Sequence, residues 1–175
     1  KHVGFNVAAD PLFTASYTGV NGGLVVCVAD DPGMHSSQNE QDSRHYAVAA
    51  KLPMLEPSDS RECRDFVKAA YEISERFDTP AVLRTCTRVA HSQCLVELHA
   101  RDEQALKPYE RNPQKYVAAP ANAVKRHIEV EKRMEALRAF AETTELNRVE
   151  MGDTAVGFVT SGTCYLYVKE AFPEA

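Results

Sequence analysis

Short apolar runs alternate with helical patterns through the first half of the chain. Residues 24–29 follow two glycines and form an unalternating, β-branched run, which is typical of a strand buried on both faces. Residues 52–56 and 81–86 predict two further strands, and Pro53 restricts the first of them to a strand start or an edge. Three strands separated by helices and joined by short connections predict right-handed crossovers and a mainly parallel sheet with helices on both faces. The fold class is therefore α/β.

Helical spacing predicts a helix in each gap between these strands. A loop through residue 40 leads to a helix over about residues 42–50. Asp59, with Glu62 three residues later, forms a capping-box pattern at the start of the second helix. The apolar residues of this helix fall on one face: Cys63, Phe66, Val67, Ala70, Ile73 and Phe77. We expect this face to pack against the sheet.

Further elements flank this unit. Asp10 and Pro11 supply an N-cap and a first-turn proline for a helix that ends before Gly19. Residues 95–98 are expected as an added edge strand. Residues 1–4 are similar to a loop that follows a strand, so the chain is expected to start inside a domain.

The composition changes near residue 101, which divides the chain. We assign residues 1–100 to the α/β unit. Residues 101–150 contain 10 basic and 9 acidic side chains and three prolines, so they are expected to form a charged connector with one helix over about residues 123–142. The helix has a narrow apolar stripe: Val130, Met134, Leu137 and Ala141. Such a stripe favours packing against its own domain over binding a partner.

Residues 151–175 are expected to begin a second α/β domain. They contain a buried-type strand at 154–160, a Ser-Gly turn and a helix at 163–172. A single strand and helix leave both strand edges and apolar faces uncovered. We therefore expect this second domain to be cut short.

Composition excludes several classes of protein. Hydrophobic residues make up 44% of the 175 residues and charged residues 26%, which is typical of a globular chain and not of a disordered one. The longest apolar run has six residues, whereas a membrane-spanning helix needs about 20. The 20 basic residues are outnumbered by 25 acidic ones, for a net charge of −5. Neither a membrane nor a nucleic acid is an expected partner.

The five cysteines bear on the cellular compartment. They are odd in number, widely spaced and mostly inside apolar stretches: Cys27, Cys63, Cys86, Cys94 and Cys164. This pattern indicates reduced thiols buried as small hydrophobic side chains, which favours a cytoplasmic protein.

The most unusual segment is the loop over residues 30–44, DDPGMHSSQNEQDSR. It follows the carboxyl end of a predicted parallel strand, where open α/β sheets bind their ligands. Hydroxyls, amides, an imidazole and carboxylates are dense in it, and apolar residues are almost absent. Composition alone favours a solvated loop that caps the next helix. The length of the loop and its polar groups leave a binding site as the alternative interpretation.

Other candidate sites are weaker. Cys86 and His91 could be a thiolate and its base, but no third group orients the imidazole, and a structural cysteine is the favoured interpretation. The cysteines and histidines do not match a zinc spacing, and we predict no metal site. No phosphate-binding loop and no G-x-G-x-x-G motif occurs.

Four sequence runs resemble one enzyme family. The loop over residues 30–44, together with residues 1–11, 53–59 and 83–92, is similar to the alpha subunit of indolepyruvate:ferredoxin oxidoreductase, and the resemblance extends more loosely to residue 175. It implies a thiamine diphosphate enzyme that oxidatively decarboxylates aryl pyruvates to acyl-CoA and passes electrons through iron–sulfur clusters to ferredoxin. The implied partners are a smaller beta subunit, ferredoxin, coenzyme A and the 2-oxo acid.

The resemblance also implies how the cofactors are divided. Residues 1–100 would be the later part of the pyrimidine-binding domain. The glutamate that activates the aminopyrimidine ring, the G-D-G…N loop for the diphosphate and Mg²⁺, and the cysteines of the [4Fe-4S] clusters are all expected outside these 175 residues. The chain would thus be an internal fragment that is inactive alone.

Residue roles follow from the same resemblance. Gly4 and Asn6 match a turn that approaches the aminopyrimidine, where glycine permits close backbone contact, and residues 36–40 match the loop facing the thiazolium and the substrate. The residues expected in catalysis are His2, His35, Gln38 and Glu40. The residues expected to bind the cofactor are Gly4, Asn6, Ser36, Ser37 and Asn39.

A non-enzymatic alternative stays open. The chain could be a Rossmann-like binding or assembly module that recruits a partner through exposed strand edges and the helix at residues 123–142. An incomplete sheet should self-associate to cover its edges, whereas an evolved module should be monomeric or form a defined dimer. Size measurement in solution distinguishes the two.

Overall fold

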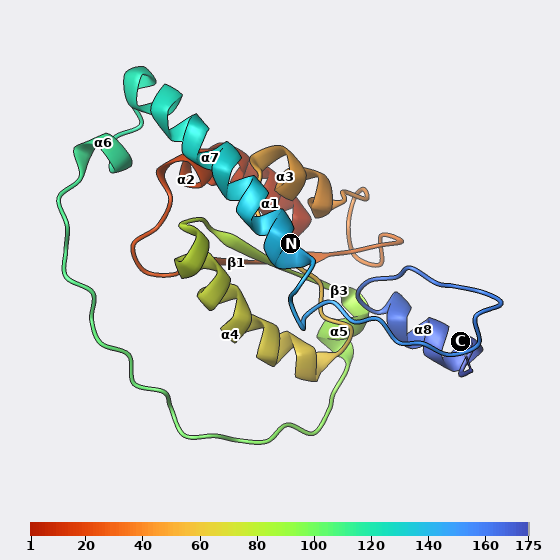
Figure 1. Cartoon of the computed structure of the whole chain (residues 1–175). Helices are drawn as coiled ribbons and strands as arrows, with labels where there is room; N and C mark the ends of the chain where they lie inside the picture. The colour runs from red at the N-terminus through yellow and green to blue at the C-terminus, as the bar shows by residue number, and fades with distance from the viewer. Residues whose placement is uncertain (175) are drawn as a thin grey trace.

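The computed structural model describes residues 1–174, which form eight helices and three strands (Figure 1). In chain order these elements are α1 (His2–Val7), α2 (Ala9–Thr18), β1 (Val25–Asp30), α3 (Ser43–Ala50), β2 (Met54–Leu55), α4 (Ser60–Phe77), β3 (Ala81–Cys86), α5 (Thr87–His91), α6 (Pro113–Tyr116), α7 (Pro120–Ala141) and α8 (Cys164–Ala171).

All three strands are parallel, and β3 lies in the centre. The order is β1-β3-β2, with Val25 paired to Ala81 at one end of the β1–β3 ladder and Asp30 paired to Cys86 at the other. Strand β2 contributes only Met54, opposite Val82, and Leu55. The predicted α/β class and parallel sheet are confirmed. Because the strands are parallel, their carboxyl ends all meet at one edge of the sheet.

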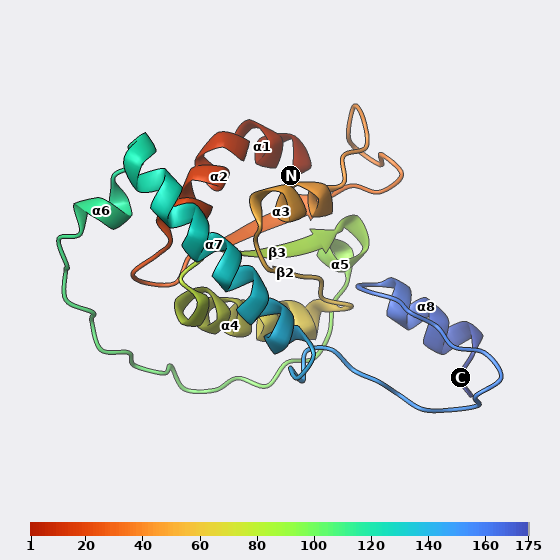
Figure 2. The same cartoon turned by 45° about the horizontal axis from the view of Figure 1, so that its top comes forward.

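Helices cover both faces of the sheet, as predicted. Val82 of β3 packs with buried residues of α1, α2 and α3, whereas its neighbour Leu83 packs with α4 and α7, because successive strand residues point to opposite faces. Figure 2 shows α1 and α2 on one side of the strands and α4 on the other. The stripe on α7 packs inward at Val130 and Leu137, which confirms packing against its own domain.

The predicted caps form with one change of partner. The Asp59 carboxylate accepts a hydrogen bond from the Glu62 amide at 2.8 Å, and Asp42 caps α3 through the Arg44 amide. The Glu62 carboxylate, however, accepts from the amide and the hydroxyl of Ser58 and not from Asp59. Both helices start where the sequence predicts.

Asp78 joins distant segments of the chain. This residue caps α4 in the left-handed conformation, and its carboxylate pairs with Lys115 at 2.7 Å and with Arg126 at 3.0 Å. Arg133 of α7 is 6% exposed and donates to the Asp78 carbonyl at 2.7 Å and to the Ser16 carbonyl at 2.6 Å. Burial lowers the pKa of the Arg133 guanidinium. These contacts hold α7 against α2 and the end of α4.

The N-terminal prediction was wrong. Residues 1–4 belong to or cap α1 instead of forming a loop. The Phe5 amide donates to the Lys1 carbonyl at 3.1 Å, and the Phe5 ring is buried in the core on the α1 side of the sheet. Burial of this ring outweighs the low helix propensity of glycine and asparagine in the same turn.

Two predicted strands do not form. Residues 95–98 are part of an extended segment that runs around the α4 side of the molecule from α5 to α6 (Figure 1). Residues 154–160 are also irregular, and Val156 and Val159 are exposed. A strand needs a neighbour to accept its backbone hydrogen bonds, and no described strand pairs with either segment. Helix α8 forms as expected.

The predicted burial of the cysteines was also wrong. All five thiols are free, but Cys27, Cys94 and Cys164 are exposed, and the other two are half-buried. Cys27 lies in β1, an edge strand of the described sheet, and its exposure follows from the missing neighbour on that side. Within residues 1–174, no helix combines the length and the apolar character needed to cross a membrane.

Candidate functional site

The predicted site lies at the carboxyl edge of the sheet. Residues 31–42 form the connection from β1 to α3, and the ends of β2 and β3 meet beside it at Glu56 and Thr87. This edge is where open parallel sheets bind ligands, because successive connections diverge there and leave backbone groups free. The structure therefore places the unusual polar loop where the sequence predicts.

A buried ion pair forms the base of this edge. Arg84 of β3 donates from Nε to Asp30 Oδ2 at 2.7 Å and from Nη1 to Glu56 Oε1 at 2.7 Å. The side chain of Asp30 is 1% exposed and that of Arg84 is 12% exposed. Asp30 also accepts hydrogen bonds from the amide and the hydroxyl of Ser43, the first residue of α3. The ends of all three strands and the start of α3 are thus held together by charge-assisted bonds.

Asp31 organises the loop from inside. Its carboxylate, in a residue that is 4% exposed, accepts from the Ser37 hydroxyl at 2.7 Å, the Ser36 amide at 2.8 Å, the Thr87 hydroxyl at 2.9 Å and the His35 amide at 3.1 Å. These hydrogen bonds, of which the one from Ser37 has the largest effect, hold the pKa of the Asp31 carboxyl well below its usual range. These donors therefore favour the ionised form of Asp31 over the neutral acid.

The loop turns sharply after Asp31. Gly33 and Met34 both have positive φ angles, 77° and 55°, and the left-handed conformation is uncommon for a residue with a side chain such as methionine. The Glu40 carboxylate accepts from the Gly33 amide at 3.2 Å and so closes the base of the loop. Further along, the Gln41 side chain donates from Nε2 to Asn39 Oδ1 at 3.0 Å.

Helix α1 faces this loop. Lys1 Nζ donates to the Ser36 carbonyl at 2.6 Å, and Asn6 Nδ2 donates to Gln41 Oε1 at 3.3 Å. Gly4 lies on the same short helix, and a Cβ atom added there would meet nothing within 4 Å. Gly4 and Asn6 are therefore helical and not in the predicted turn, yet α1 does lie beside the loop, as the predicted site requires.

The predicted site residues differ in their surroundings. Those of the loop are exposed or half-exposed: His35, Ser36, Ser37, Gln38, Asn39 and Glu40. Gln38 and the ring of His35 have no hydrogen-bond partner among residues 1–174, so both are available to a ligand. His2 is fully buried instead, and neither of its ring nitrogens has a partner in the described part of the chain. The structure thus brings the loop residues and Asn6 together, but it does not expose His2.

Sequence reasoning missed the charged residues that support the loop. Arg84 and Glu56 stand in predicted strands or directly after them, and Thr87 follows β3. The sequence does contain one indication of this cluster, which is Arg84 inside an otherwise apolar strand. A buried strand tolerates such a charge only when a carboxylate pairs with it. Its partner, Asp30, is the last residue of the neighbouring strand.

Arg44 adds a more exposed pair at the end of the loop. Its guanidinium contacts the Asp42 carboxylate at 2.7 Å and lies 3.8 Å from Glu56 Oε1. Hydrogen bonding by Arg44 lowers the pKa of Asp42 to about 2. Asp30, Asp42 and Glu56 are therefore each paired with an arginine, and residues 35–39 of the loop present mainly neutral donors and acceptors.

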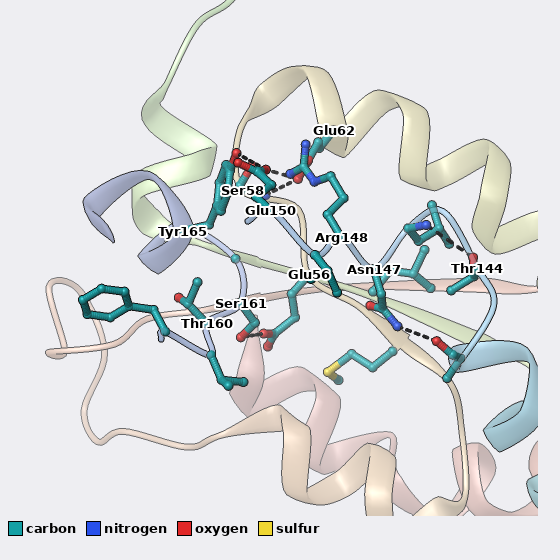
Figure 3. Close-up of a pocket in the computed structure, with 18 of the residues that line it drawn as sticks. Glu56, Ser58, Glu62, Thr144, Asn147, Arg148, Glu150, Thr160, Ser161 and Tyr165 are labelled. Atoms are coloured by element: carbon teal, nitrogen blue, oxygen red, sulfur yellow. Dashed lines mark hydrogen bonds and ion pairs between the residues drawn. The ribbon is translucent and has the colours of Figure 1, made fainter. Parts of the chain in front are cut away.

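A separate cavity of about 1170 Å³ lies between β2, α4 and α7 and the segment over residues 144–169 (Figure 3). Its wall is mainly apolar, and its rim is polar. At the rim, Ser161 donates to Glu56 at 2.8 Å, Arg148 pairs with Glu62 at 2.7 Å, and Tyr165 donates to Glu150 at 2.8 Å. Through Glu56 this rim adjoins the charged cluster, but the cavity contains none of the predicted site residues.

The comparisons with known proteins identify the sequence relatives. The chain is 45% identical over 173 residues to the "Indolepyruvate oxidoreductase subunit IorA" of Archaeoglobus fulgidus and 47% identical over 174 residues to that of Methanothermobacter thermautotrophicus. It is 44% identical over 178 residues to IorA of Pyrococcus horikoshii. Each match covers 98% of this chain and 28% of the relative. No family model and no solved structure matches the chain. Over almost its whole length, the chain is therefore similar to the indolepyruvate oxidoreductase subunit IorA, of which it spans 28%.

Proposed function

We propose that the chain is part of the large subunit of a thiamine diphosphate-dependent oxidoreductase that converts indolepyruvate and other aryl pyruvates to acyl-CoA, with ferredoxin as electron acceptor. The observation that supports this most is the identity of 44–47% to IorA proteins over 98% of the chain. The matched residues include the polar loop at the carboxyl edge of the sheet. Because the chain spans 28% of those relatives, we assign the activity to a longer protein. We propose that this protein acts with a beta subunit.

The loop fits one end of thiamine diphosphate by its chemistry. The amides and hydroxyls of Asn6, Ser36, Ser37 and Asn39 are neutral donors and acceptors, which suit an aminopyrimidine and a thiazolium ring better than a diphosphate. The open space beside Gly4 leaves room for a ring against α1. When bound, thiamine diphosphate supplies the carbon nucleophile and the electron sink for decarboxylation.

The side chains of this chain would orient the substrate. The ring of His35 and the side chain of Gln38 are exposed and have no hydrogen-bond partner within residues 1–174, so they can donate hydrogen bonds to the 2-oxo acid carboxylate. Glu40 is committed to the Gly33 amide and would act by keeping the loop closed. His2, the first residue of α1, is fully buried, and a direct role for it requires α1 to shift.

The diphosphate end is assigned to another part of the longer protein, together with Mg²⁺ and the [4Fe-4S] clusters. A cofactor contacted by only one of its two domains lacks the charge pairing of its diphosphate, which is usually its largest anchoring interaction. We therefore propose that residues 1–175 alone are inactive. The five free cysteines agree with a cytoplasmic location, where thiols stay reduced.

Activity of the complex tests the proposal directly. The full-length subunit, co-expressed with its beta subunit, should reduce ferredoxin when indolepyruvate, coenzyme A and thiamine diphosphate are all present. Omission of any one of the three is the control. A complex that binds all its cofactors but reduces ferredoxin with none of the aryl pyruvates would contradict the proposed reaction.

Calorimetry tests the part assigned to this chain. Titration of residues 1–175 with thiamine diphosphate and Mg²⁺ should show no binding at micromolar concentrations, whereas the full complex should bind. Tight binding by the 175-residue chain would show that it holds the diphosphate itself and would contradict the division of the cofactor site.

A further inference from the structure

Asp31 differs from the other buried or half-buried carboxylates at the carboxyl edge of the sheet. Asp30, Asp42 and Glu56 each lie within 4 Å of an arginine, whereas no basic group among residues 1–174 lies that close to Asp31. The residue is nevertheless 4% exposed. A buried carboxylate without a cation persists only when hydrogen-bond donors replace its hydration. The buried Asp31 carboxylate is therefore stabilised by the hydrogen bonds that it accepts and not by an ion pair.

The four donors come from two different connections. Three of them are the His35 and Ser36 amides and the Ser37 hydroxyl, so three successive loop residues converge on one carboxylate. The fourth is the hydroxyl of Thr87, the first residue of α5 after β3. Asp31 thus ties the loop that follows β1 to the end of the neighbouring strand.

Few other contacts hold this part of the loop. The Met34 amide donates to the Asp31 carbonyl, and the Gly33 amide donates to Glu40, but these bonds stay within the loop. The only other link from His35, Ser36 or Ser37 to the rest of the described chain by a hydrogen bond is from Lys1 to Ser36. The loop also contains Met34 at a φ of 55°, and for a residue other than glycine this left-handed conformation persists only when the surroundings enforce it.

We propose that Asp31 is a positioning residue for the reaction: its carboxylate fixes the backbone of residues 35–37 and so sets the direction in which His35, Ser36 and Ser37 face the cofactor ring and the 2-oxo acid. This inference rests on the proposed function. Asp31 itself touches neither substrate nor cofactor, because all of its acceptor positions are occupied by the protein.

The substitution Asp31→Asn tests the inference in the full-length complex with its beta subunit. The amide keeps the volume but replaces one acceptor oxygen by an NH₂ donor, so two of the four protein donors lose their acceptor. The readouts are kcat and KM for indolepyruvate and the hydrogen exchange of backbone amides in residues 33–41, followed by mass spectrometry. The control is Asp65→Asn, which removes the same charge from an exposed position on α4.

We expect Asp31→Asn to lower kcat/KM by about tenfold to hundredfold, since small misplacements of orienting groups have effects of this size. Exchange should become faster in residues 33–41 and stay unchanged in α4 and β3. Thr87→Val should shift both readouts in the same direction by less, and the double variant should be no worse than Asp31→Asn alone, because both changes loosen the same contact. Asp65→Asn should match the wild type.

Three results would overturn the inference. One is an Asp31→Asn complex with wild-type kcat/KM, and another is lost activity with unchanged exchange in residues 33–41. The third is faster exchange through the whole domain, which would indicate a role in stability only. If Asp31→Asn does not fold, Thr87→Val alone decides by the same two readouts. A wild-type complex that fails to oxidise indolepyruvate would refute the proposed function instead, and that failure is separate from any result on the variants.

Discussion

Replacing Arg84 by methionine should destabilise the chain strongly and in a manner that depends on pH. The change removes the cation between Asp30 and Glu56 but retains most of the side-chain volume. Removing one partner of a buried ion pair typically costs about 3–5 kcal/mol, because the other charge is left uncompensated. The side chain of Asp30, at 1% exposed, would be that charge.

Protonation sets an upper limit on this cost. An unpaired carboxylate takes up a proton once ionisation becomes the less favourable state. For an ordinary aspartic acid, protonation costs about 4 kcal/mol at pH 7 and about 1.5 kcal/mol at pH 5. The hydrogen bonds from Ser43 remain and reduce the loss further. We therefore expect a destabilisation of about 3 kcal/mol at pH 7 that falls to about 1 kcal/mol at pH 5.

Urea denaturation followed by circular dichroism at the two pH values measures the effect. Arg138→Met is the matched control, because its pair with Glu135 is about 70% exposed on both sides and should contribute less than about 0.5 kcal/mol. The double variant Arg84→Met with Asp30→Asn should recover much of the stability at pH 7. An equal loss at pH 7 and pH 5, or a loss at pH 7 no larger than that of the control, would show that the pair does not hold the strand ends together.

Three further outcomes can be measured on the same material. Arg44 lowers the pKa of Asp42 to about 2, so the ionised Asp42 carboxylate stabilises the folded chain. This stabilisation is complete above the pKa of the unfolded state, near 3.8, and is lost as the pH falls toward 2. Asp42→Asn should therefore remove about 1–2 kcal/mol at pH 5 and flatten the acid limb of the stability curve, and an unchanged limb would contradict the pairing. Leu137→Ala, at a residue 9% exposed in the core, should cost about 2–4 kcal/mol by urea denaturation, whereas Val124→Ala on the same helix, 69% exposed, should cost less than about 0.5. Sedimentation velocity of residues 1–175 should show a mass that rises with concentration, because β1 and β2 each have an unpaired edge in the described sheet, and a monomer at every concentration would count against this self-association.

The local patterns in the sequence predicted most of the framework. The β-branched run in β1 and the capping pattern at Asp59 each depend on neighbouring residues alone, and both elements form within a residue or two of the prediction. The position of the polar loop at the carboxyl edge of the sheet followed from the order of these elements. A short run of neighbouring residues was therefore sufficient to predict each of these elements.

What the sequence could not predict depends on distant partners. The segment at 154–160 has the composition of a strand but finds no described strand to pair with, and α1 forms because Phe5 reaches a core made by other elements. The support of the loop by Asp31 and Thr87 joins positions 56 residues apart. Such contacts are fixed by register and packing and leave no periodic signal in the sequence.

The central strand has a consequence for how the domain unfolds. Val82 and Leu83 are adjacent in β3, yet each belongs to a different hydrophobic cluster on its own side of the sheet. Neither cluster can therefore open without disturbing the strand that lines the other. We expect the α/β unit to melt as a single cooperative transition, with hydrogen exchange of the β3 amides reporting the global free energy of unfolding and not a local fluctuation.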